Sequence, residues 1–325
     1  MHYLLTGGAG FIGSHLGERL LKDGHSITIL DDFSTGREAN ITHLRSNPKL
    51  DLIRDTVENE QTAALVVSRA DAIFHLAAAV GVKLVAEEPV RTIRTTIHGT
   101  EVILEAAHRF GKPVLITSSS EVYGKGTRVP FREEDDVLMG ATKFSRWCYA
   151  YSKGIDEFLG LAYHKQFALP VTLVRLFNTV GPRQIGMYGM VLPRFVAAAL
   201  ANQPLEVYGD GNQTRCFSHV FDVVDALIKL MATPKAVGDV FNLGGHEETS
   251  MNDLARRVIG LANSKSEIRH IPYEQAYGRA FDDLPRRVPD LNKIKSMIGF
   301  TPHYSLDQII KSVLDEQLVI RQPQP

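Results

Sequence analysis

Tyr149 and Lys153 are the two residues whose types and spacing suggest catalysis most directly. They stand four residues apart in a stretch with helical periodicity, so both side chains are expected on one face of a helix. An ammonium group beside a phenol stabilises the phenolate and lowers the pKa of the phenol from ~10 towards neutrality. The pair therefore predicts a base that removes a proton from an alcohol while hydride leaves the same carbon.

A second group of polar residues closes a predicted strand in the stretch 117–124, which reads T-S-S-S-E-V-Y-G. The carboxyl end of a strand in a parallel sheet is where ligands bind. We therefore expect the hydroxyls of Ser119 and Ser120 to contact the substrate oxygen that becomes a carbonyl. Glu121 is the candidate for a second acid or base, with an ordinary surface acid as the alternative interpretation.

A glycine-rich loop follows the first predicted strand and opens a helix. A backbone without Cβ atoms can turn tightly and approach a pyrophosphate, and a helix N-terminus offers free N–H groups to it. The spacing G-x-x-G-x-x-G therefore predicts a dinucleotide site, whose candidate contacts are Gly7, Gly10, Phe11, Ile12 and Gly13.

Two carboxylates, Asp31 and Asp32, end the second predicted strand, 18 residues after Gly13. A carboxylate at this place accepts hydrogen bonds from the adenosine ribose and repels a 2′-phosphate. The sequence thus favours NAD over NADP as the cofactor. Arg37 keeps NADP open as the alternative, because a nearby arginine can accommodate the extra phosphate.

The elements that must position these residues alternate between strand and helix. Continuous apolar strands separated by amphipathic helices predict an α/β fold with a Rossmann-type, doubly wound parallel sheet. The expected strands cover residues 3–6, 26–30, 51–53, 72–76, 114–118 and 171–176, and the expected helices cover 11–22, 62–68, 90–110 and 149–167.

Glycine and proline become frequent after residue 178, which predicts a smaller, interwoven lobe in the C-terminal half. We expect an NAD-binding Rossmann domain over residues 1–177, to which a strand near 240–243 returns. Residues 178–318 are then mainly a substrate-binding lobe, and 319–325 a flexible tail.

Composition excludes several other classes of protein. The 325 residues include 36 Lys and Arg and 37 Asp and Glu, which gives a net charge of −1. The chain therefore lacks the excess of positive charge that is typical of nucleic-acid-binding proteins. No apolar run reaches the ~18 residues that span a membrane. Cys148 and Cys216 alone cannot build a disulfide framework or a zinc site, and the histidines lack metal-ligand spacing. We therefore expect a cytoplasmic protein without a metal.

Together these motifs resemble the extended short-chain dehydrogenase/reductase family, and within it the NAD-dependent nucleotide-sugar epimerases, dehydratases and decarboxylases. The resemblance covers nearly the whole chain and rests on Thr6–Gly13, Asp31, Ser119–Gly124, Tyr149, Lys153, Arg175–Arg183, Val207–Arg215 and Arg286–Asp290. It implies tightly held NAD, a nucleoside-diphosphate sugar as substrate, and a homodimer through a four-helix bundle built from residues 90–110 and 149–167.

The chain resembles UDP-glucuronic acid decarboxylases most, on the Ser120–Glu121 pair, Arg146 and Arg287. Two arginines also suit a hexuronate, because Arg pairs with carboxylates bidentately. The resemblance implies oxidation at C4, loss of carbon dioxide from the 4-keto sugar, and return of hydride to give a UDP-pentose.

The same resemblance implies roles for individual residues. Tyr149, Lys153, Ser119, Ser120, Glu121 and Arg287 would be catalytic. Asp55, Thr56, Leu76, Ala77, Ala78, Tyr149 and Lys153 would join the glycine loop and the two aspartates in binding NAD. Arg146, Asn178, Arg215, Arg287 and Lys83 would bind the UDP-sugar.

Three alternatives stay open. A 4-epimerase acting on UDP-glucose or UDP-glucuronate uses the same oxidation, and the segment 79–83 resembles epimerases more than decarboxylases. A 4,6-dehydratase suits Glu121 but lacks the Asp that should precede it. A non-catalytic dinucleotide-binding protein would have no use for Tyr149 and Lys153. Thr96 stands where many relatives carry Asn, so the hydrogen bond by which that Asn supports the active-site backbone is an open question in this chain.

Overall fold

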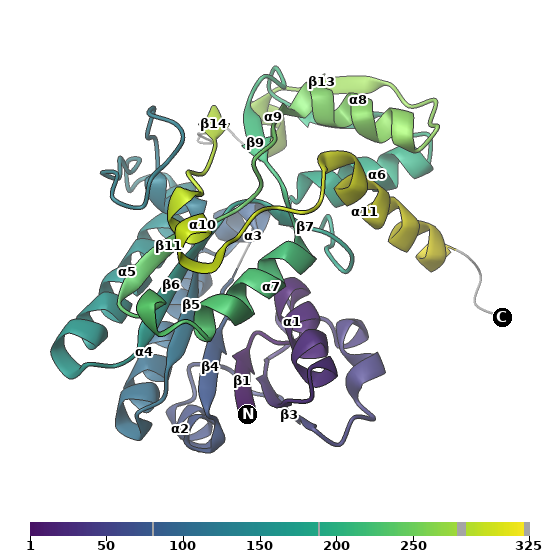
Figure 1. The fold of residues 1–325 in the computed structure, drawn as a ribbon. Helices are drawn as coiled ribbons and strands as arrows, with labels where there is room; N and C mark the ends of the chain where they lie inside the picture. The colour runs from purple at the N-terminus through teal and green to yellow at the C-terminus, as the bar shows by residue number, and fades with distance from the viewer. Residues whose placement is uncertain (80, 188, 278–283, 322–325) are drawn as a thin grey trace.

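A parallel sheet of seven strands forms the centre of the protein (Figure 1). The computed structural model describes residues 1–79, 81–187, 189–277 and 284–321. The strand order is β11-β6-β5-β4-β1-β2-β3, and every neighbouring pair is parallel. The bounds are β1 (His2–Thr6), β2 (Ser26–Leu30), β3 (Leu50–Ile53), β4 (Ala72–His75), β5 (Val114–Ser119), β6 (Val171–Leu176) and β11 (Asp239–Leu243). The predicted doubly wound α/β fold is confirmed.

Helices cover both faces of this sheet. One face packs against α1 (Phe11–Lys22), α7 (Val220–Met231) and α10 (Asn292–Ile298). The other packs against α2 (Glu60–Arg69), α4 (Pro89–Phe110) and α5 (Cys148–Phe167). Each helix turns an apolar stripe inwards, and a fully buried leucine or isoleucine there stabilises the fold by about 2 kcal/mol. The sheet is therefore a rigid platform for whatever its strands carry at their ends.

The order of the strands reverses between β1 and β4. In doubly wound sheets, ligands bind in the crevice outside the carboxyl ends of the strands at such a reversal. The glycine loop after β1 and the chain after β4 meet there, because a Cβ on Gly7 would lie 2.9 Å from the Cα of Ala77. This crowding explains why the loop requires glycine.

A smaller lobe lies over the carboxyl ends of the strands (Figure 1). Its helices are α6 (Val191–Leu200), α8 (Met251–Leu261), α9 (Tyr273–Tyr277) and α11 (Leu306–Arg321). Its strands are β7 (Thr179–Val180), β8 (Leu205–Tyr208), β9 (Thr214–Cys216), β10 (Ser218–His219), β12 (Glu248–Ser250), β13 (Ile268–Ile271) and β14 (Arg286–Arg287). Buried side chains of α6, α8 and α11 give the lobe a core of its own.

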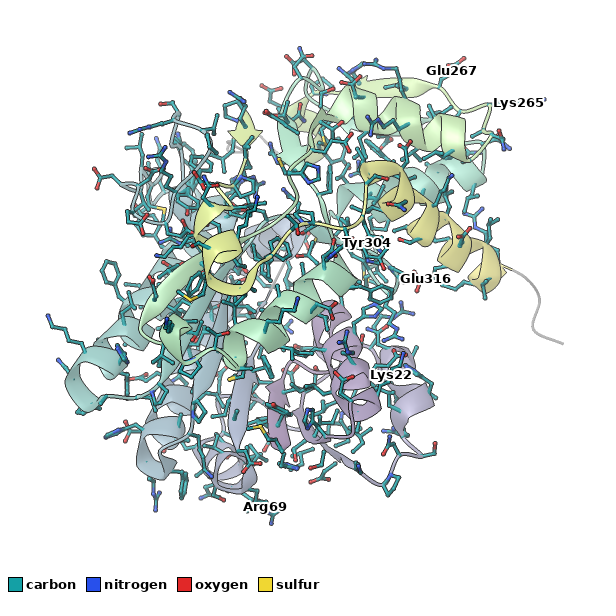
Figure 2. The ribbon with its side chains drawn as sticks, viewed as in Figure 1. Lys22, Arg69, Lys265, Glu267, Tyr304 and Glu316 are labelled. Carbon is teal, nitrogen blue, oxygen red and sulfur yellow. The ribbon has the colours of Figure 1, made fainter. Side chains whose placement is uncertain are left out.

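The chain passes repeatedly between the lobe and the sheet domain. After β10 it enters α7 on the sheet, and β11 then pairs with β6. Arg183 joins the two parts directly: its backbone N–H donates to Glu316 of α11 at 2.6 Å, and its guanidinium pairs with Glu18 of α1. Figure 2 shows Glu316 on the side of α11 that is turned towards α1. The lobe is thus fastened over the strand ends.

Several elements of the structure were not predicted or differ in their bounds, and the helix before α4 and the end of α11 are two of them. A short helix, α3 (Val82–Glu87), precedes α4 where no element was predicted. Residues 319–321, predicted as part of a flexible tail, complete α11, and residues 322–325 lie outside the described residues. Within the described ranges, no helix has the length and apolar character needed to cross a bilayer.

Candidate active site

A cavity of about 480 Å³ lies between the carboxyl ends of the strands and the lobe. It brings together residues from every motif that the sequence analysis selected. The predicted substrate contact of Lys83 cannot be placed, because the side chain of Lys83 lies outside the described residues. The cavity is lined by all the other predicted site residues: Gly7, Gly10, Phe11, Ile12, Gly13, Asp31, Asp32, Asp55, Thr56, Leu76, Ala77, Ala78, Ser119, Ser120, Glu121, Arg146, Tyr149, Lys153, Asn178, Arg215 and Arg287.

The glycine loop has the form that a dinucleotide pyrophosphate requires. Gly10 precedes α1 without a side-chain capping bond, and the first turn of α1 carries no acidic side chain. The N–H groups and the positive end of the helix dipole therefore face the cavity unopposed by a protein anion. A Cβ on Gly13 would lie 2.3 Å from the Gly7 carbonyl oxygen, so only glycine fits there.

Asp31 directly follows β2 and lines the same subsite at its other end. Its carboxylate accepts the backbone N–H groups of Ala9 at 2.9 Å and Phe33 at 2.8 Å, which fix its orientation. Burial raises the pKa of Asp31, and these two hydrogen bonds oppose the rise. A Cβ on Gly36 would lie 2.7 Å from the carboxylate. The residues present thus fit a dinucleotide whose ribose lies beside Asp31.

Asp55 plays a structural part in the same wall. Its carboxylate accepts hydrogen bonds from the Thr56 backbone N–H at 2.8 Å, the Thr62 hydroxyl at 2.5 Å and the Asn59 amide at 2.8 Å. The Thr62 bond is the largest cause of its lowered pKa. Asp55 therefore holds the loop before α2 and faces the cavity from that fixed position.

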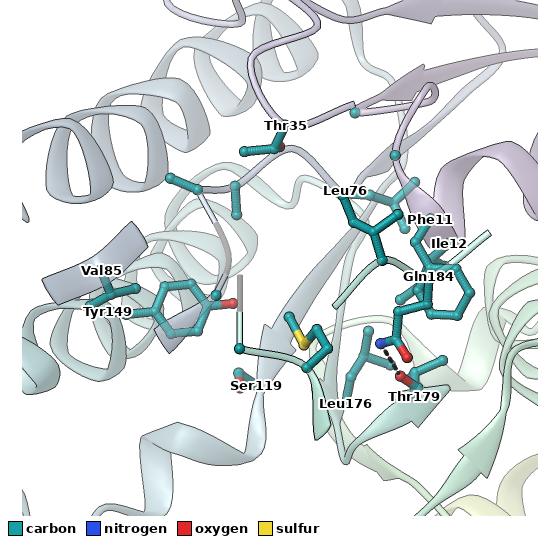
Figure 3. A pocket seen from close by; sticks show the side chains of 18 of the residues that line it. Phe11, Ile12, Thr35, Leu76, Val85, Ser119, Tyr149, Leu176, Thr179 and Gln184 are labelled. Carbon is teal, nitrogen blue, oxygen red and sulfur yellow. Dashed lines mark hydrogen bonds between the residues drawn. The ribbon is translucent and has the colours of Figure 1, made fainter. Parts of the chain in front are cut away.

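Tyr149 and Ser119, two of the predicted catalytic residues, both line the cavity. Figure 3 shows the hydroxyl of Tyr149 turned into the cavity. Ser119 accepts the backbone N–H of Glu121 at 3.2 Å, and its side chain hydrogen-bonds with Tyr149. Burial raises the pKa of Tyr149 above its usual range, the charges of Glu121 and Asp156 raise it further, and the Ser119 bond opposes them.

The pKa of Tyr149 is raised in this structure, whereas the sequence predicts that the ammonium of Lys153 lowers it. Both residues are on α5, as predicted, but the ammonium of Lys153 pairs with Asp156 at 3.0 Å. The two charged groups are almost wholly buried, with side-chain exposures of 2% and 0%. Burial is the largest cause of the raised pKa of Tyr149, and the negative charges of Glu121 and then Asp156 add to it, while Asp156 also neutralises the ammonium locally.

Glu121 lies between two arginines. It is part of the short helix η3 (Ser120–Tyr123), and its carboxylate accepts from Arg146 at 2.6 Å and from Arg287 at 2.5 Å. Burial raises the pKa of Glu121, but Arg146, Arg287 and Arg215 outweigh that effect and lower it to about 2. Glu121 is therefore a carboxylate at neutral pH.

Two predicted substrate contacts have protein partners at the edge of the cavity. Arg215 donates to the carbonyl oxygens of Thr214 and Leu284 at 2.8 Å each, and Asn178 donates to the Cys216 carbonyl at 3.2 Å. Both side chains are thus held in place by backbone oxygens, and both line the cavity.

Two further sets of residues belong to the site and are not among the predicted ones. Asp156 follows Lys153 by three positions on a helix, a spacing that brings side chains together and that the analysis could have used. The lobe wall of the cavity includes Gln184, Arg194, Tyr208 and Tyr273. Of these four, only Tyr208 stands in a stretch that carries the family resemblance, Val207–Arg215. The fold alone brings the lobe residues to the site.

Comparisons with known proteins agree with this geometry. The family model described as GDP-mannose 4,6 dehydratase matches residues 4–313. The chain is 45% identical over 312 residues to the UDP-N-acetyl-alpha-D-glucosaminuronate decarboxylase of Bacillus cytotoxicus, covering 96% of each chain. It is 38% identical over 311 residues to UDP-glucuronic acid decarboxylase 2 of Arabidopsis thaliana, covering 95% of this chain and 66% of that one.

Solved structures give the same picture of the fold. The UDP-glucuronic acid 4-epimerase of Bacillus cereus, solved with UDP-glucuronic acid and NAD, superposes with a TM-score of 0.89. The two chains are 27% identical, and the match covers 98% of this chain and 100% of that one.

Proposed function

The chain belongs to the extended short-chain dehydrogenase/reductase family, in the group of NAD-dependent nucleotide-sugar enzymes, and from this premise we propose that it decarboxylates a UDP-linked hexuronic acid. The observation that carries the proposal is the buried Arg146–Glu121–Arg287 cluster beside Tyr149. Paired guanidinium groups recognise carboxylates. A hexuronic acid adds one carboxylate to the diphosphate that every member of the group must bind.

The cofactor in this proposal is NAD, held by residues that the structure already orients. The uncapped start of α1 would bind the pyrophosphate, and the carboxylate of Asp31 would accept from the ribose hydroxyls and repel a 2′-phosphate. Bound NAD would supply a reversible acceptor for the hydride at C4 of the sugar.

Tyr149 and Ser119 act at the C4 oxygen. Tyr149 must ionise first, which burial opposes and the ammonium of Lys153 favours; as the phenolate it takes the proton of the C4 hydroxyl. The Ser119 hydroxyl stabilises the oxygen as it becomes a carbonyl. A 4-keto sugar has its carboxylate β to a carbonyl, so carbon dioxide can leave while the two residues stabilise the enolate oxygen. Tyr149 returns the proton to that oxygen when the alcohol is restored.

The arginine cluster acts at the carboxylate end. Arg146 and Arg287 orient the hexuronate, and Arg215 adds positive charge for the diphosphate. Because Glu121 is ionised, it cannot protonate C5 itself. In our proposal it orients a water molecule, together with Ser120, that delivers this proton.

Two substrates fit this chemistry. UDP-glucuronic acid follows from the motifs of the sequence, and its 2-acetamido counterpart follows from the 45% identity to the Bacillus cytotoxicus decarboxylase. A 4-epimerase remains the competing reaction, because it uses the same oxidation and the Bacillus cereus epimerase shares the fold.

We further propose a homodimer built on α4 and α5. These helices pack together and leave Ile93, Ile155 and Phe158 exposed by 40%, 43% and 75%. Such an apolar face on paired helices suits association with the same pair in a second copy. The division into a sheet domain over 1–177, to which a strand near 240–243 returns, and a mainly substrate-binding lobe over 178–318 belongs to the same proposal; α7 and α10 of the second range also pack against the sheet. We also propose a cytoplasmic location, in keeping with the free thiols of Cys148 and Cys216.

The test is to incubate the purified protein separately with UDP-glucuronic acid, UDP-N-acetylglucosaminuronic acid and UDP-glucose, and to identify the products by NMR. We expect one of the two uronates to give carbon dioxide and a UDP-pentose in equal amounts. Formation of UDP-galacturonic acid without carbon dioxide would establish the epimerase instead, and conversion of UDP-glucose alone would rule out the decarboxylase.

A further inference from the structure

Gln213 carries a side-chain amide whose orientation is fixed by the fold. It stands in the loop between β8 and β9, and its Nε2 donates to the Tyr208 carbonyl oxygen at 2.9 Å. A carbonyl oxygen only accepts, so the nitrogen end of the amide must face Tyr208. The other end, Oε1, is buried and has no hydrogen-bond partner in the part of the chain that the structure describes. Because Gln213 lines the cavity, a ligand there can supply the donor that this oxygen lacks.

The loop that carries Gln213 is held in place at several points. The Met251 backbone N–H donates to the Gln213 carbonyl oxygen at 3.2 Å. The Asn252 side chain donates to the Asp210 carbonyl oxygen at 2.9 Å, and its backbone N–H donates to the Gly211 carbonyl oxygen at 3.1 Å. Gly211 has a φ of +76°, and a Cβ there would clash with the Asn252 side chain. The loop thus packs directly against the start of α8, and Oε1 of Gln213 is preorganised.

Gln213, Arg215 and Arg287 follow one another along the lobe wall of the cavity. Gln213 directly precedes β9, Arg215 is the second residue of that strand, and both line the cavity. Two residues along a strand span about 7 Å, which leaves room for a ribose between a diphosphate and a base. β14 lies beside β9 with Arg287 opposite Arg215, and Arg287 reaches Glu121. The row therefore leads from the proposed uronate site, past the proposed diphosphate contact, to Gln213.

The wall around Gln213 suits a flat ring. It is lined by aromatic and apolar residues of β8, α8, α9 and the chain after β9: Val207, Tyr208, Phe217, Met251 and Tyr273. The guanidinium of Arg194 lies 4.1 Å from the centroid of the Tyr208 ring. Aromatic and apolar side chains around one fixed polar atom are typical of a site that binds a heteroaromatic ring and orients it. The end of the row away from the reaction therefore fits the base of the nucleotide.

We propose that Gln213 is a specificity-determining residue: its Oε1 accepts the N3–H of the uracil ring and so selects uracil over cytosine. Uracil carries a proton on N3, whereas N3 of cytosine is an acceptor and would face the acceptor of Gln213. A buried oxygen that is left unpaired disfavours the ligand that lacks the donor. The inference rests on the proposed function, because the row starts from the proposed uronate site.

The first experiment measures the binding of UDP and CDP by calorimetry in the wild type and in Gln213→Met, whose side chain has a similar size but no amide. We expect the wild type to bind UDP at least about tenfold more tightly than CDP. Gln213→Met should bind the two with similar affinity, because UDP binding weakens. Gln203→Met is the matched control: Gln203 is exposed and does not line the cavity, so the ratio should stay as in the wild type. Equal affinities in the wild type, or a preference for UDP that survives in Gln213→Met, would overturn the proposal.

The second experiment uses 2′-deoxy-UDP, because the ribose hydroxyl is another donor on the same ligand. We expect the ratio of the affinities for UDP and 2′-deoxy-UDP to be the same in the wild type and in Gln213→Met. If this ratio fell to one in the variant while the preference over CDP remained, Gln213 would be a ribose contact and the proposal would be wrong. Should Gln213→Met not fold, N3-methyl-UDP is measured on the wild type. It should bind at least about tenfold more weakly than UDP, and equal binding would overturn the proposal.

Nucleotide binding needs no turnover, so the two proposals fail separately. If the wild type converts a uronate but Gln213→Met keeps the preference for UDP, the assignment of Gln213 is wrong and the function stands. If the wild type converts no uronate while the preference for UDP depends on Gln213, the decarboxylation is wrong and the assignment of Gln213 stands.

Discussion

The charge of Glu121 is set by its neighbours at the scale of single residues. Two guanidinium groups at 2.5 and 2.6 Å lower its pKa to about 2, although burial by itself would raise it. The sequence could nominate Glu121, Arg146 and Arg287, because each stands in a recognisable stretch. It could not show that they bind one another, since Arg287 reaches the site only through the pairing of β14 with β9.

The variant Glu121→Gln should lose a pH-dependent part of the free energy of unfolding. The folded pKa of about 2 lies below the ordinary value of 4.5, so the stabilisation is full above pH 4.5 and is lost as the pH falls towards 2. The shift corresponds to about 3 kcal/mol. We expect urea unfolding between pH 3 and 7 to show that the difference in the free energy of unfolding between wild type and variant becomes smaller as the pH falls. A constant gap would mean that Glu121 is not the group that titrates.

Tyr149→Phe should lose turnover by at least about a hundredfold while binding of the UDP-sugar persists, because a phenyl ring keeps the shape of the site but cannot move a proton. Trp147 is the only tryptophan in the sequence, and Arg146 stacks on it at 5.0 Å, so its fluorescence should report binding. A variant with unchanged turnover would exclude Tyr149 as the base, and the fluorescence response to UDP serves as the control for an intact site.

At the scale of elements, the sequence predicted best where an element has both a strong apolar pattern and a clear end. The bounds of α1, β2 and β6 agree with the expected 11–22, 26–30 and 171–176. The six residues of α3 have neither a strong apolar pattern nor a clear end, and Gly81 before this helix provides no side-chain cap. The partner of Lys153, in contrast, follows from a local pattern, because Asp156 stands three positions after it on the same helix.

Gly13→Ala tests the packing of the glycine loop against α1. The new Cβ would lie 2.3 Å from the Gly7 carbonyl oxygen, so the loop must move, at a cost of about 2 kcal/mol. We expect a lower unfolding midpoint and at least about tenfold weaker NAD binding by calorimetry. Gly260→Ala is the control, because nothing lies within 4 Å of its Cβ inside α8 and alanine favours a helix. If Gly13→Ala and Gly260→Ala had the same unfolding midpoint and the same NAD affinity, the glycine loop would not be tightly packed against α1.

At the scale of the whole molecule, the lobe and the sheet domain enclose the site together, and Arg183 fastens one to the other through Glu316 and Glu18. The sequence indicated an interwoven lobe from its glycine and proline content. Which lobe residues face the cavity follows from the tertiary structure, because Gln184, Tyr208 and Tyr273 come from separate segments.

Phe158→Asp should convert the proposed dimer into a monomer, because the ring is 75% exposed on α5 and a charge there opposes burial in an interface. Light scattering after gel filtration measures the mass, and the unfolding midpoint should stay near that of the wild type. Leu65→Asp, at an exposed site on α2, should leave the mass unchanged. A wild type that is already monomeric would refute the dimer.

The central claim is a decarboxylation in which hydride leaves C4 of the sugar and returns to the same molecule. The most direct measurement uses the UDP-uronate that the protein converts, labelled with deuterium at C4, and follows the product by NMR without added NADH. We predict a UDP-pentose that keeps its deuterium at C4, with one carbon dioxide released for each molecule converted. A pentose with hydrogen at C4, or a product that retains C6, would contradict the account.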